Sequence, residues 1–411
     1  MIRRIPISDI CTIYDGPHAT PKKTEIGPIY LGINAITADG KLDPTEYAHL
    51  SDEDYVKWTK RVTPKPLDIV FSYEATLGRY AIIPEGFYGC LGRRLAIIRN
   101  TSKYIDTRWL YYYFRSPEWT GFINSKIIKG STVNRISIED FPSYTIPLIP
   151  FETQKKIVNV LLTIDEKIDT NQKISDNLQK QLDLLYDYWF TQFDFPDANG
   201  NPYKASGGEM DWNEQLKREI PKGWKDGDLY DIADYINGLA CQKYRPREGE
   251  DFLPVIKIKE MHQGINKDTE KISINIPDKN KIENGDILFS WSATLEVMYW
   301  NGGHAGLNQH IFKVVPRDYF SKEYVYHQLS SYVINFVRMA EARKTTMGHI
   351  TSDHLSQSKI VIPPESIIDQ FNVLGSPLHK KIQICIQENL ELVKLRDWLL
   401  PMLMNGQVTV E

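Results

Sequence analysis

The chain has 411 residues, of which 42% are hydrophobic and 25% are charged, and a formal net charge of −4. These values are ordinary for a globular protein of two or three domains, and they argue against a protein that coats DNA by bulk positive charge alone. The sequence contains no run of 18 apolar residues, no apolar signal region at its start and no C-x-x-C pair among its four cysteines. We therefore expect an intracellular, cytoplasmic protein without a membrane span, a disulfide framework or a metal site.

Residues 1–150 predict a first strand-rich domain. Short apolar runs bounded by glycine, proline or aspartate are typical of strands, and they occupy residues 29–33, 68–71, 81–83 and 95–98. An aromatic-rich helix is expected to begin near Thr107. Lysine and arginine outnumber aspartate and glutamate in this segment, whereas the predicted long helices carry an acidic excess. This distribution allows local positive potential despite the negative total.

Residues 151–191 predict a long helix. Apolar residues recur there at alternating steps of four and three, which is the spacing of a coiled-coil seam. We expect Thr153 to cap the helix and residues 193–196 to end it, which gives a length of about 57 Å at 1.5 Å per residue. Asn171 and Ser175 interrupt the seam. Its apolar positions are Ile157, Leu161, Ile164, Ile168, Leu178, Leu182, Leu185 and Trp189.

The rest of the chain follows the same plan. Residues 192–222, rich in glycine, proline and asparagine, predict a linker, and residues 223–362 predict a second strand-rich domain with a helix near 322–337. Residues 363–411 predict a second long helix, whose seam is interrupted at Asn389 and Arg396. The apolar positions of this seam include Leu378, Ile382, Leu392 and Leu399. Because neither helix can bury its stripe alone, we expect them to pair antiparallel; packing of each helix on its own domain is the alternative.

Two segments of the chain are nearly the same. The string D-I-V-F-S-Y-E-A-T-L at residues 68–77 returns as D-I-L-F-S-W-S-A-T-L at residues 286–295, with Glu74 against Ser292 as the clear departure. Gly16 likewise reappears as Gly238 after a matching Asp-Ile pair. Two copies indicate a duplicated protein with pseudo-two-fold symmetry rather than a solenoid. The predicted fold class is α+β, with two strand-rich domains separated by two long antiparallel helices that form a coiled coil.

The sequence lacks the motifs that catalysis on nucleic acids would require. A P-loop is absent, as are a glycine-rich cofactor loop and the N-P-P-Y or D-P-P-Y tetrapeptide of an adenine methyltransferase. No acidic-x-Lys triplet follows Pro277-Asp278, and His304 and His310 have a spacing unlike that of common zinc sites. We therefore predict no catalytic residues, no metal ligands and no cofactor bound by this chain.

Basic and amide side chains occur in glycine- or serine-rich loops at matching points of the two copies. Such side chains read base edges and anchor phosphates, although a single basic loop is more often a solvated surface. Gly92-Arg93-Arg94 stands where the second copy has Asn308-Gln309-His310, so the shared framework carries different polar tips. The predicted DNA-binding residues of the first copy are Lys22, Lys23, Arg79, Arg93, Arg94, Lys129, Ser131, Thr132, Asn134 and Arg135. Those of the second copy are Gln242, Lys243, Arg245, Lys257, Lys259, Gln309, His310, Arg343, Lys344, Thr345, Thr346 and His349.

Four strings outside the repeated segment are informative together: D-G-P-H-A-T-P at 15–21, Y-D-Y-W-F-T-Q-F-D-F-P at 186–196, P-Y-K-A-S-G-G-E-M at 202–210 and L-R-D-W-L-L-P-M-L-M-N-G-Q-V at 395–408. With these strings the chain resembles, over essentially its whole length, the specificity subunit of type I restriction–modification systems. It implies two target recognition domains, at 1–150 and 223–362, that each read one half of a split, asymmetric site in double-stranded DNA. It also implies conserved helices at 151–191 and 363–411, with 192–222 as the linker.

The same resemblance implies partners that supply the chemistry. Two methyltransferase subunits would bind S-adenosylmethionine and methylate adenines, and restriction subunits that use ATP and magnesium belong to some such systems. Two alternatives stay open at this point. A freestanding DNA-binding regulator is disfavoured by the near-neutral charge, and a pure coiled-coil adaptor leaves the paired basic loops unexplained.

Overall fold

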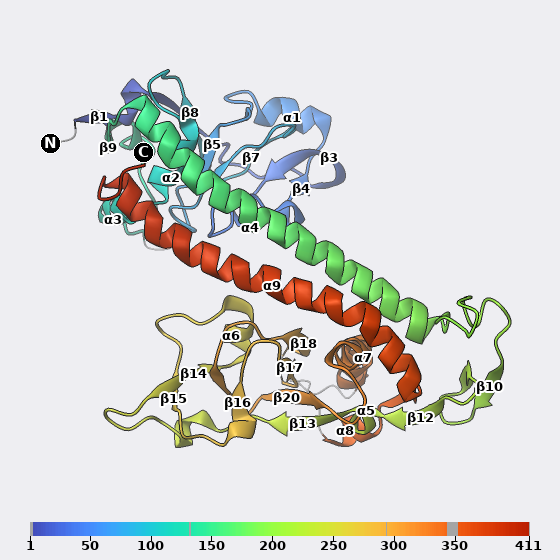
Figure 1. Ribbon diagram of the computed structural model, residues 1–411. Coiled ribbons are helices and arrows are strands. Elements are labelled where there is room, and N and C mark those ends of the chain that lie inside the picture. Colours follow the sequence, from blue (N-terminus) through green and yellow to red (C-terminus); the bar gives the residue numbers. More distant parts are fainter. Residues whose placement is uncertain (1–2, 131–132, 293, 343–351, 411) are drawn as a thin grey trace. The chain divides into compact units, whose positions relative to one another are not determined.

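The computed structural model describes residues 3–130, 133–292, 294–342 and 352–410. The chain forms two compact units: unit 1 comprises residues 1–168 and 391–411, and unit 2 comprises residues 169–390. Two long helices, α4 (Phe151–Tyr186) and α9 (Glu365–Met404), each begin in one unit and end in the other (Figure 1). The predicted α+β fold class is confirmed.

Unit 1 is built on two sheets. One is antiparallel with the strand order β2-β8-β5-β6, and the other has the order β4-β3-β7, in which β3 and β7 are parallel. A short ladder joins β1 to β9. The strands are β1 (Arg4–Pro6), β2 (Cys11–Asp15), β3 (Thr24–Leu31), β4 (Ala48–His49), β5 (Ile69–Ser72), β6 (Tyr80–Ile82), β7 (Gly89–Leu91), β8 (Leu95–Asn100) and β9 (Thr145–Pro147).

Short helices cover the core of unit 1. They are α1 (Asp52–Trp58), α2 (Thr107–Phe114) and α3 (Pro117–Ser125). Helix α2 begins where the sequence predicts, because the Asp106 carboxylate accepts hydrogen bonds from the backbone N–H groups of Arg108 and Trp109. Its aromatic run is buried from Trp109 to Phe114 and belongs to the same apolar core as the first turns of α4.

Unit 2 repeats this plan. An antiparallel sheet has the order β13-β20-β17-β18, and a second sheet has the order β15-β14-β19-β16, in which β14 and β19 are parallel. Strand β12 pairs with β21, and β10 with β11. The strands are β10 (Met210–Asn213), β11 (Arg218–Pro221), β12 (Lys225–Asp228), β13 (Ala233–Asn237), β14 (Phe252–Ile256), β15 (Lys271–Ser273), β16 (Lys281–Ile282), β17 (Ile287–Ser290), β18 (Glu296–Tyr299), β19 (Ala305–Leu307), β20 (Ile311–Pro316) and β21 (Lys359–Ile362). The helices are α5 (Leu229–Ile232), α6 (Ile258–Gln263), α7 (Lys322–Ala342) and α8 (Ser352–Ser356).

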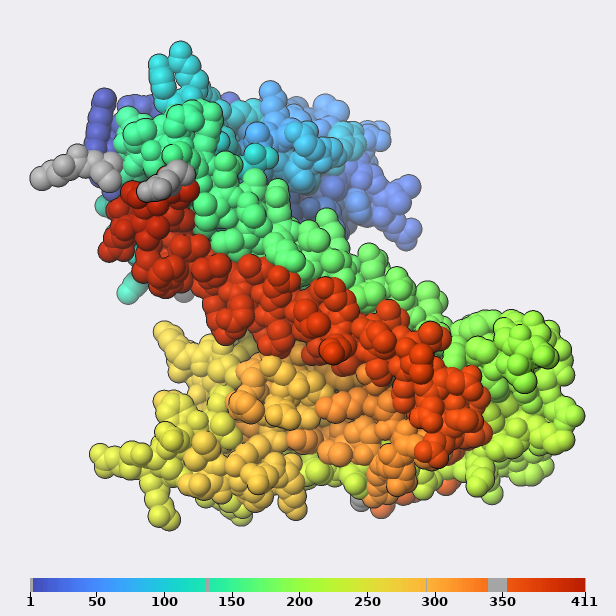
Figure 2. All heavy atoms as spheres, viewed as in Figure 1, coloured from blue at the N-terminus to red at the C-terminus, as the bar shows by residue number. Residues whose placement is uncertain are grey.

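Helices α4 and α9 pair within each unit, and the space-filling view shows their surfaces in contact (Figure 2). In unit 1 the Arg396 guanidinium donates a 3.0 Å hydrogen bond to Asp165. In unit 2 the Asn171 amide donates to Asn389 at 3.0 Å, and Leu182 lies beside Gly375. Because the partner number falls as the α4 number rises, the helices run antiparallel, as predicted. Of the four polar residues that interrupt the seams, Asn171, Asn389 and Arg396 therefore pair with polar residues of the other helix.

The seam positions predicted from the sequence are all buried or half-buried in the structure. Two details of the first helix differ from expectation. Thr153 does not cap it, because α4 already begins at Phe151 and the Gln154 backbone N–H bonds the Pro150 carbonyl. The last predicted seam residue, Trp189, lies in a π-helical turn (Asp187–Thr191) that follows α4.

The segment predicted as a linker contributes to the core of unit 2. Phe193, Phe195 and Ile220 are buried there, and Phe195 stacks on Trp224 with ring centroids 5.1 Å apart. Within the described part of the chain, no helix is both long and apolar enough to cross a membrane.

Candidate nucleic-acid interface

The first tip is defined as residues 92–94 and the second tip as residues 308–310. The loops beside the two tips form the same backbone hydrogen bonds in both units, and this shared pattern is called the framework. In unit 1 the Tyr73 backbone N–H donates to the Arg94 carbonyl at 3.2 Å, and in unit 2 Trp291 donates to the His310 carbonyl at 3.3 Å. The serines at the ends of β5 and β17 also match, because Ser72 and Ser290 each donate a hydroxyl hydrogen bond to the carbonyl of the threonine four residues later. The repeated string F-S-Y/W-x-A-T is therefore a hydrogen-bonded loop that sets the position of the neighbouring tip.

Glycine is required at one point of this framework in each copy. The Gly16 N–H donates to the Leu95 carbonyl at 2.9 Å, and the Gly238 N–H donates to the Ile311 carbonyl at 3.1 Å. A Cβ added to Gly16 would lie 2.6 Å from that carbonyl oxygen, and one added to Gly238 would lie even closer to the Asn308 carbonyl oxygen. The close approach of two backbones explains why both copies keep a glycine here.

The two arginines of the first tip have different surroundings. Arg94 has a φ of +73°, is half-buried, and places its Nε 2.9 Å from a carboxylate oxygen of Glu74. Arg93 is exposed, and among the described residues its guanidinium forms no hydrogen bond or ion pair. Its backbone N–H donates to the Tyr30 hydroxyl at 3.2 Å. Arg94 is thus fixed by the framework, whereas the Arg93 side chain is available to a ligand.

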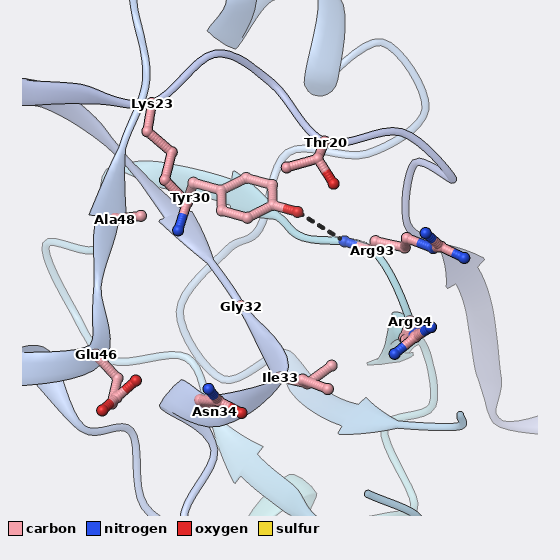
Figure 3. A pocket seen from close by; sticks show the side chains of 10 residues that line it. All are labelled: Thr20, Lys23, Tyr30, Gly32, Ile33, Asn34, Glu46, Ala48, Arg93 and Arg94. Atoms are coloured by element: carbon pink, nitrogen blue, oxygen red, sulfur yellow. Dashed lines mark hydrogen bonds between the residues drawn. The ribbon is translucent and has the colours of Figure 1, made fainter. Parts of the chain in front are cut away.

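The first tip borders a polar pocket of about 340 Å³ (Figure 3). Lys23 reaches into it beside Tyr30, and the Arg93 side chain extends away from the Tyr30 ring (Figure 3). Asn34 and Glu46 contribute to the opposite side of the lining. The pocket therefore brings together residues from the loop before β3, the turn after β3 and the β7–β8 loop.

A second loop meets the framework beside this tip. The Ala75 N–H donates to the Asn134 carbonyl, and Glu74 forms a β-bridge with Arg135. The side chains of Asn134 and Arg135 are exposed, as are those of Lys22 and Lys129. Arg135 also lines a cavity of about 380 Å³ with Tyr73, whose pKa is raised by burial and by a hydrogen bond with Asp15. These contacts place two of the predicted strings next to each other in unit 1.

Arg79 has a structural contact that its sequence position did not indicate. Its guanidinium donates a 2.9 Å hydrogen bond to the Ile36 carbonyl, and the side chain is half-buried. This bond ties the β5–β6 loop to the turn after β3. Its assignment to DNA binding stays a prediction.

One basic cluster was missed by the sequence analysis. Lys57, Lys60 and Arg61, at the end of α1, line a cavity of about 460 Å³ with His18. The His18 Nε2 lies 3.0 Å from a carboxylate oxygen of Asp15, in the D-G-P-H-A-T-P string. Because about 40 residues separate the string from the cluster, only the tertiary fold brings them together. Basic side chains around such a cavity suit phosphate contacts.

The second tip is organised differently from the first. His310 is half-buried against the Trp291 ring, with ring centroids 5.6 Å apart, and its backbone N–H donates to the Asn308 side chain at 3.3 Å. Gln309 donates its backbone N–H to the Leu239 carbonyl, and its amide nitrogen lies 3.3 Å from a ring nitrogen of His310. An aromatic contact therefore replaces the ion pair that fixes the first tip.

The remaining predicted residues of unit 2 belong to two groups. Lys243 and Arg245 line a cavity of about 640 Å³ with Arg247, which the sequence analysis did not include, and Gln242 is exposed in the short helix Cys241–Lys243. Lys257 pairs with Glu270 at 2.6 Å, a hydrogen bond that raises the pKa of Lys257, while Lys259 is exposed in α6. Lys257 therefore has an acidic partner within the protein, whereas Arg245 and Lys259 form no ion pair with the residues that the structure describes.

Several predictions concern residues outside the described part of the chain, and the structure gives no account of them. They are Ser131, Thr132, Arg343, Lys344, Thr345, Thr346 and His349. In the ranges that the structure does describe, no group of three or more histidine, cysteine or acidic residues is placed to hold a metal ion.

The sequence matches the family described as the type I restriction modification DNA specificity domain, at residues 4–180 and again at 221–384. The chain belongs to this family. The two matches coincide with the two copies of the repeat, and the predicted resemblance is confirmed. Membership also confirms that the chain is a specificity subunit rather than a catalytic one.

Full-length relatives support the assignment. The MjaIX specificity subunit of Methanocaldococcus jannaschii is 24% identical over 85% of this chain and 79% of its own length. The HindI specificity subunit of Haemophilus influenzae is 23% identical over 80% of this chain and 84% of its own length. The crystal structure of a type I S subunit from M. genitalium has a TM-score of 0.58 and 15% identity, and covers 98% of this chain and 96% of that one. This specificity subunit therefore shares its fold with an S subunit of known structure.

Proposed function

We propose that this specificity subunit reads a bipartite, asymmetric DNA target through its two repeated domains and docks two adenine methyltransferase subunits. One observation carries the proposal: the two units share a hydrogen-bonded loop framework but present unlike side chains from it. Arg93 and Arg94 occupy the positions of Gln309 and His310. A common frame with different polar tips is what two readers of two different half-sites require, because sequence is read by hydrogen bonds to base edges.

Partner docking is supported by two exposed apolar residues at matching places in the long helices. Leu184 is 68% exposed and Trp398 is 55% exposed. Each lies 33 positions after the first residue of its helix, from 151 to 184 in α4 and from 365 to 398 in α9. Isolated exposed apolar residues are common, but their repetition by the duplication favours two equivalent sites for two copies of one partner.

In this proposal the chemistry belongs to the partners. S-adenosylmethionine would be bound by the methyltransferase subunits, and restriction subunits, where present, would use ATP and magnesium. The role of this chain is to hold the methyltransferases at the target adenines. Methylation of a base in a duplex requires the base to leave the stack, which is the task of the catalytic subunit.

An exchange of domains tests the recognition role. Residues 1–150 are replaced by the matching segment of a relative, the hybrid is co-expressed with its methyltransferase, and methylated adenines are mapped by sequencing. We expect the first half-site to change while the second half-site stays the same. A change in both half-sites, or methyl transfer by the purified chain alone, would contradict the proposal.

Substitution of the apolar residues tests docking. We expect Trp398→Glu and Leu184→Glu each to reduce the number of bound methyltransferase subunits from two to one, measured by native mass spectrometry. Val373→Glu is the control, because Val373 is 73% exposed on α9 but its counterpart in α4 is the polar Asn159. Two bound subunits in all three variants would rule out these docking points.

A further inference from the structure

The two tips each contain one fixed and one available side chain. In unit 1, Arg94 is fixed by Glu74 while the Arg93 guanidinium has no partner among the described residues. In unit 2, His310 packs on Trp291, and the Gln309 side chain forms no hydrogen bond within the described residues other than its contact with His310. Positions 93 and 309 are therefore equivalent by the backbone framework; the Arg93 side chain is exposed, and the half-buried Gln309 side chain has its amide in contact with His310 alone among the described residues.

The chemistry of the two available side chains differs in a way that selects different bases. A guanidinium carries only donors, in a planar fork that matches the two acceptors, O6 and N7, of guanine in the major groove. A glutamine amide carries one donor and one acceptor, which match N7 and the N6 amino group of adenine. The same framework position would thus read a G·C pair in one half-site and an A·T pair in the other.

We propose that Arg93 reads a guanine of the first half-site and that Gln309 reads an adenine at the equivalent step of the second half-site. Arg94 and His310 act as positioning residues that set the direction of the neighbouring side chain. This inference rests on the proposed function, because it assumes that each tip enters the major groove. It goes further by assigning one base to one residue in each domain.

Reciprocal substitution tests the assignment. The chain is assembled with its methyltransferase subunits and used to select DNA from pools of duplexes in which one half-site is randomised and the other is kept at its mapped sequence. We expect Arg93→Gln to exchange guanine for adenine at one position of the first half-site, and Gln309→Arg to exchange adenine for guanine in the second. A bidentate base contact discriminates by about five- to 150-fold, so the preference should change by a factor in that range.

Matched controls separate base reading from charge and from folding. Lys103→Gln removes one positive charge from an exposed position between β8 and α2, and Gln215→Arg adds one to the exposed β10–β11 hairpin. Both should leave the selected sequences unchanged. The assignment of Arg93 would be overturned if the Arg93→Gln variant still selected guanine at every position where the original chain selects it. The assignment of Gln309 would be overturned if the Gln309→Arg variant still selected adenine at all of its original positions. If the unmodified complex selected no sequence at all, the proposed function would fail instead.

Discussion

The ion pair between α4 and α9 in unit 1 offers a quantitative test of the helix pairing. Arg396 has only 9% of its side chain exposed and Asp165 has 16%. Asp165 also accepts a 2.6 Å hydrogen bond from the Tyr112 hydroxyl of α2. Burial by itself lowers the pKa of Arg396, but its hydrogen bonds and charge interactions with Asp165 and Asp397 together outweigh burial and leave that pKa raised. The pair therefore joins both long helices to the core of unit 1.

Removing one partner should be much more costly than removing both. Arg396→Leu leaves a mostly buried carboxylate without its cation, and such a loss typically costs 3–5 kcal/mol. Because Asp165 keeps the Tyr112 hydroxyl and some exposure, we expect about 3 kcal/mol, or roughly a hundredfold in the folding equilibrium. In the double variant Asp165→Leu/Arg396→Leu no buried charge is left and only the Tyr112 hydroxyl loses its acceptor, so part of the stability should return.

The assay is urea unfolding of the full chain followed by circular dichroism, with the single and double variants forming a double-mutant cycle. Lys394→Ala is the control, because Lys394 and Glu391 form an ion pair on the same helix with 72% and 73% of their side chains exposed. Exposed pairs of this kind contribute about 0.5 kcal/mol or less. The reasoning would be refuted if Arg396→Leu lowered the free energy of unfolding no more than Lys394→Ala does. It would also be refuted if the loss in the double variant equalled the sum of the losses in the two single variants.

Three further outcomes follow from the structure. Gly16→Ala should lower the free energy of unfolding by about 1–3 kcal/mol, because the new Cβ would lie 2.6 Å from the Leu95 carbonyl oxygen. Gly121→Ala is the control in thermal unfolding, because open space surrounds Gly121 and the added Cβ should not destabilise the chain. Burial lowers the pKa of both His327 and His379, so the unfolded chain binds protons below about pH 6.5 that the folded chain does not bind. His327 alone should lower stability by about 1.4 kcal/mol between pH 7.5 and 5.5, measured by urea midpoints, and His327→Gln should reduce the loss of the chain without removing the part due to His379. In a third variant, one heptad is inserted in α4 after Asn171 and one in α9 at Asn389, which should lengthen the paired helices by about 10 Å. Methylation mapping should then show that the DNA between the two half-sites is longer by about three base pairs, with both half-sites unchanged.

Much of the fold could be predicted because its signals are local. The aromatic helix after Asp106, the strands on either side of the repeated string and the two seams all follow from spacing along the chain. The partners of the polar seam residues were not predictable in this way. Asn171 finds Asn389 only once the register of two helices more than 200 residues apart is set. The N-cap of α4 was predicted too late in the chain. Thr153 is a residue type that often caps helices, but the helix begins at Phe151, directly after Pro150.

The candidate interface was predictable where the repeat marked it and not elsewhere. The contrast between residues 92–94 and 308–310 pointed to the two tips, and the structure places both on the same framework. The cavity with Lys57, Lys60 and Arg61 carried no such mark, because these residues lie in a helix end and turn with no counterpart noted in the second copy. Arg79 forms a contact that its position in a basic loop did not indicate, because its guanidinium donates a hydrogen bond to the Ile36 carbonyl, and its assignment to DNA binding stays a prediction.

The one clear departure within the repeated string has a physical cause that only the structure reveals. Glu74 in the first copy is Ser292 in the second, and this difference accompanies the change from Arg94 to His310. An arginine held in the half-buried corner of the tip requires an anion, which Glu74 provides at 2.9 Å. A histidine can be neutral and pack on an aromatic ring, so the second copy needs no carboxylate and has the Trp291 indole beside it. The framework thus accepts two chemically different anchors at one position, and the residue before each anchor can vary without disturbing the loop that presents it.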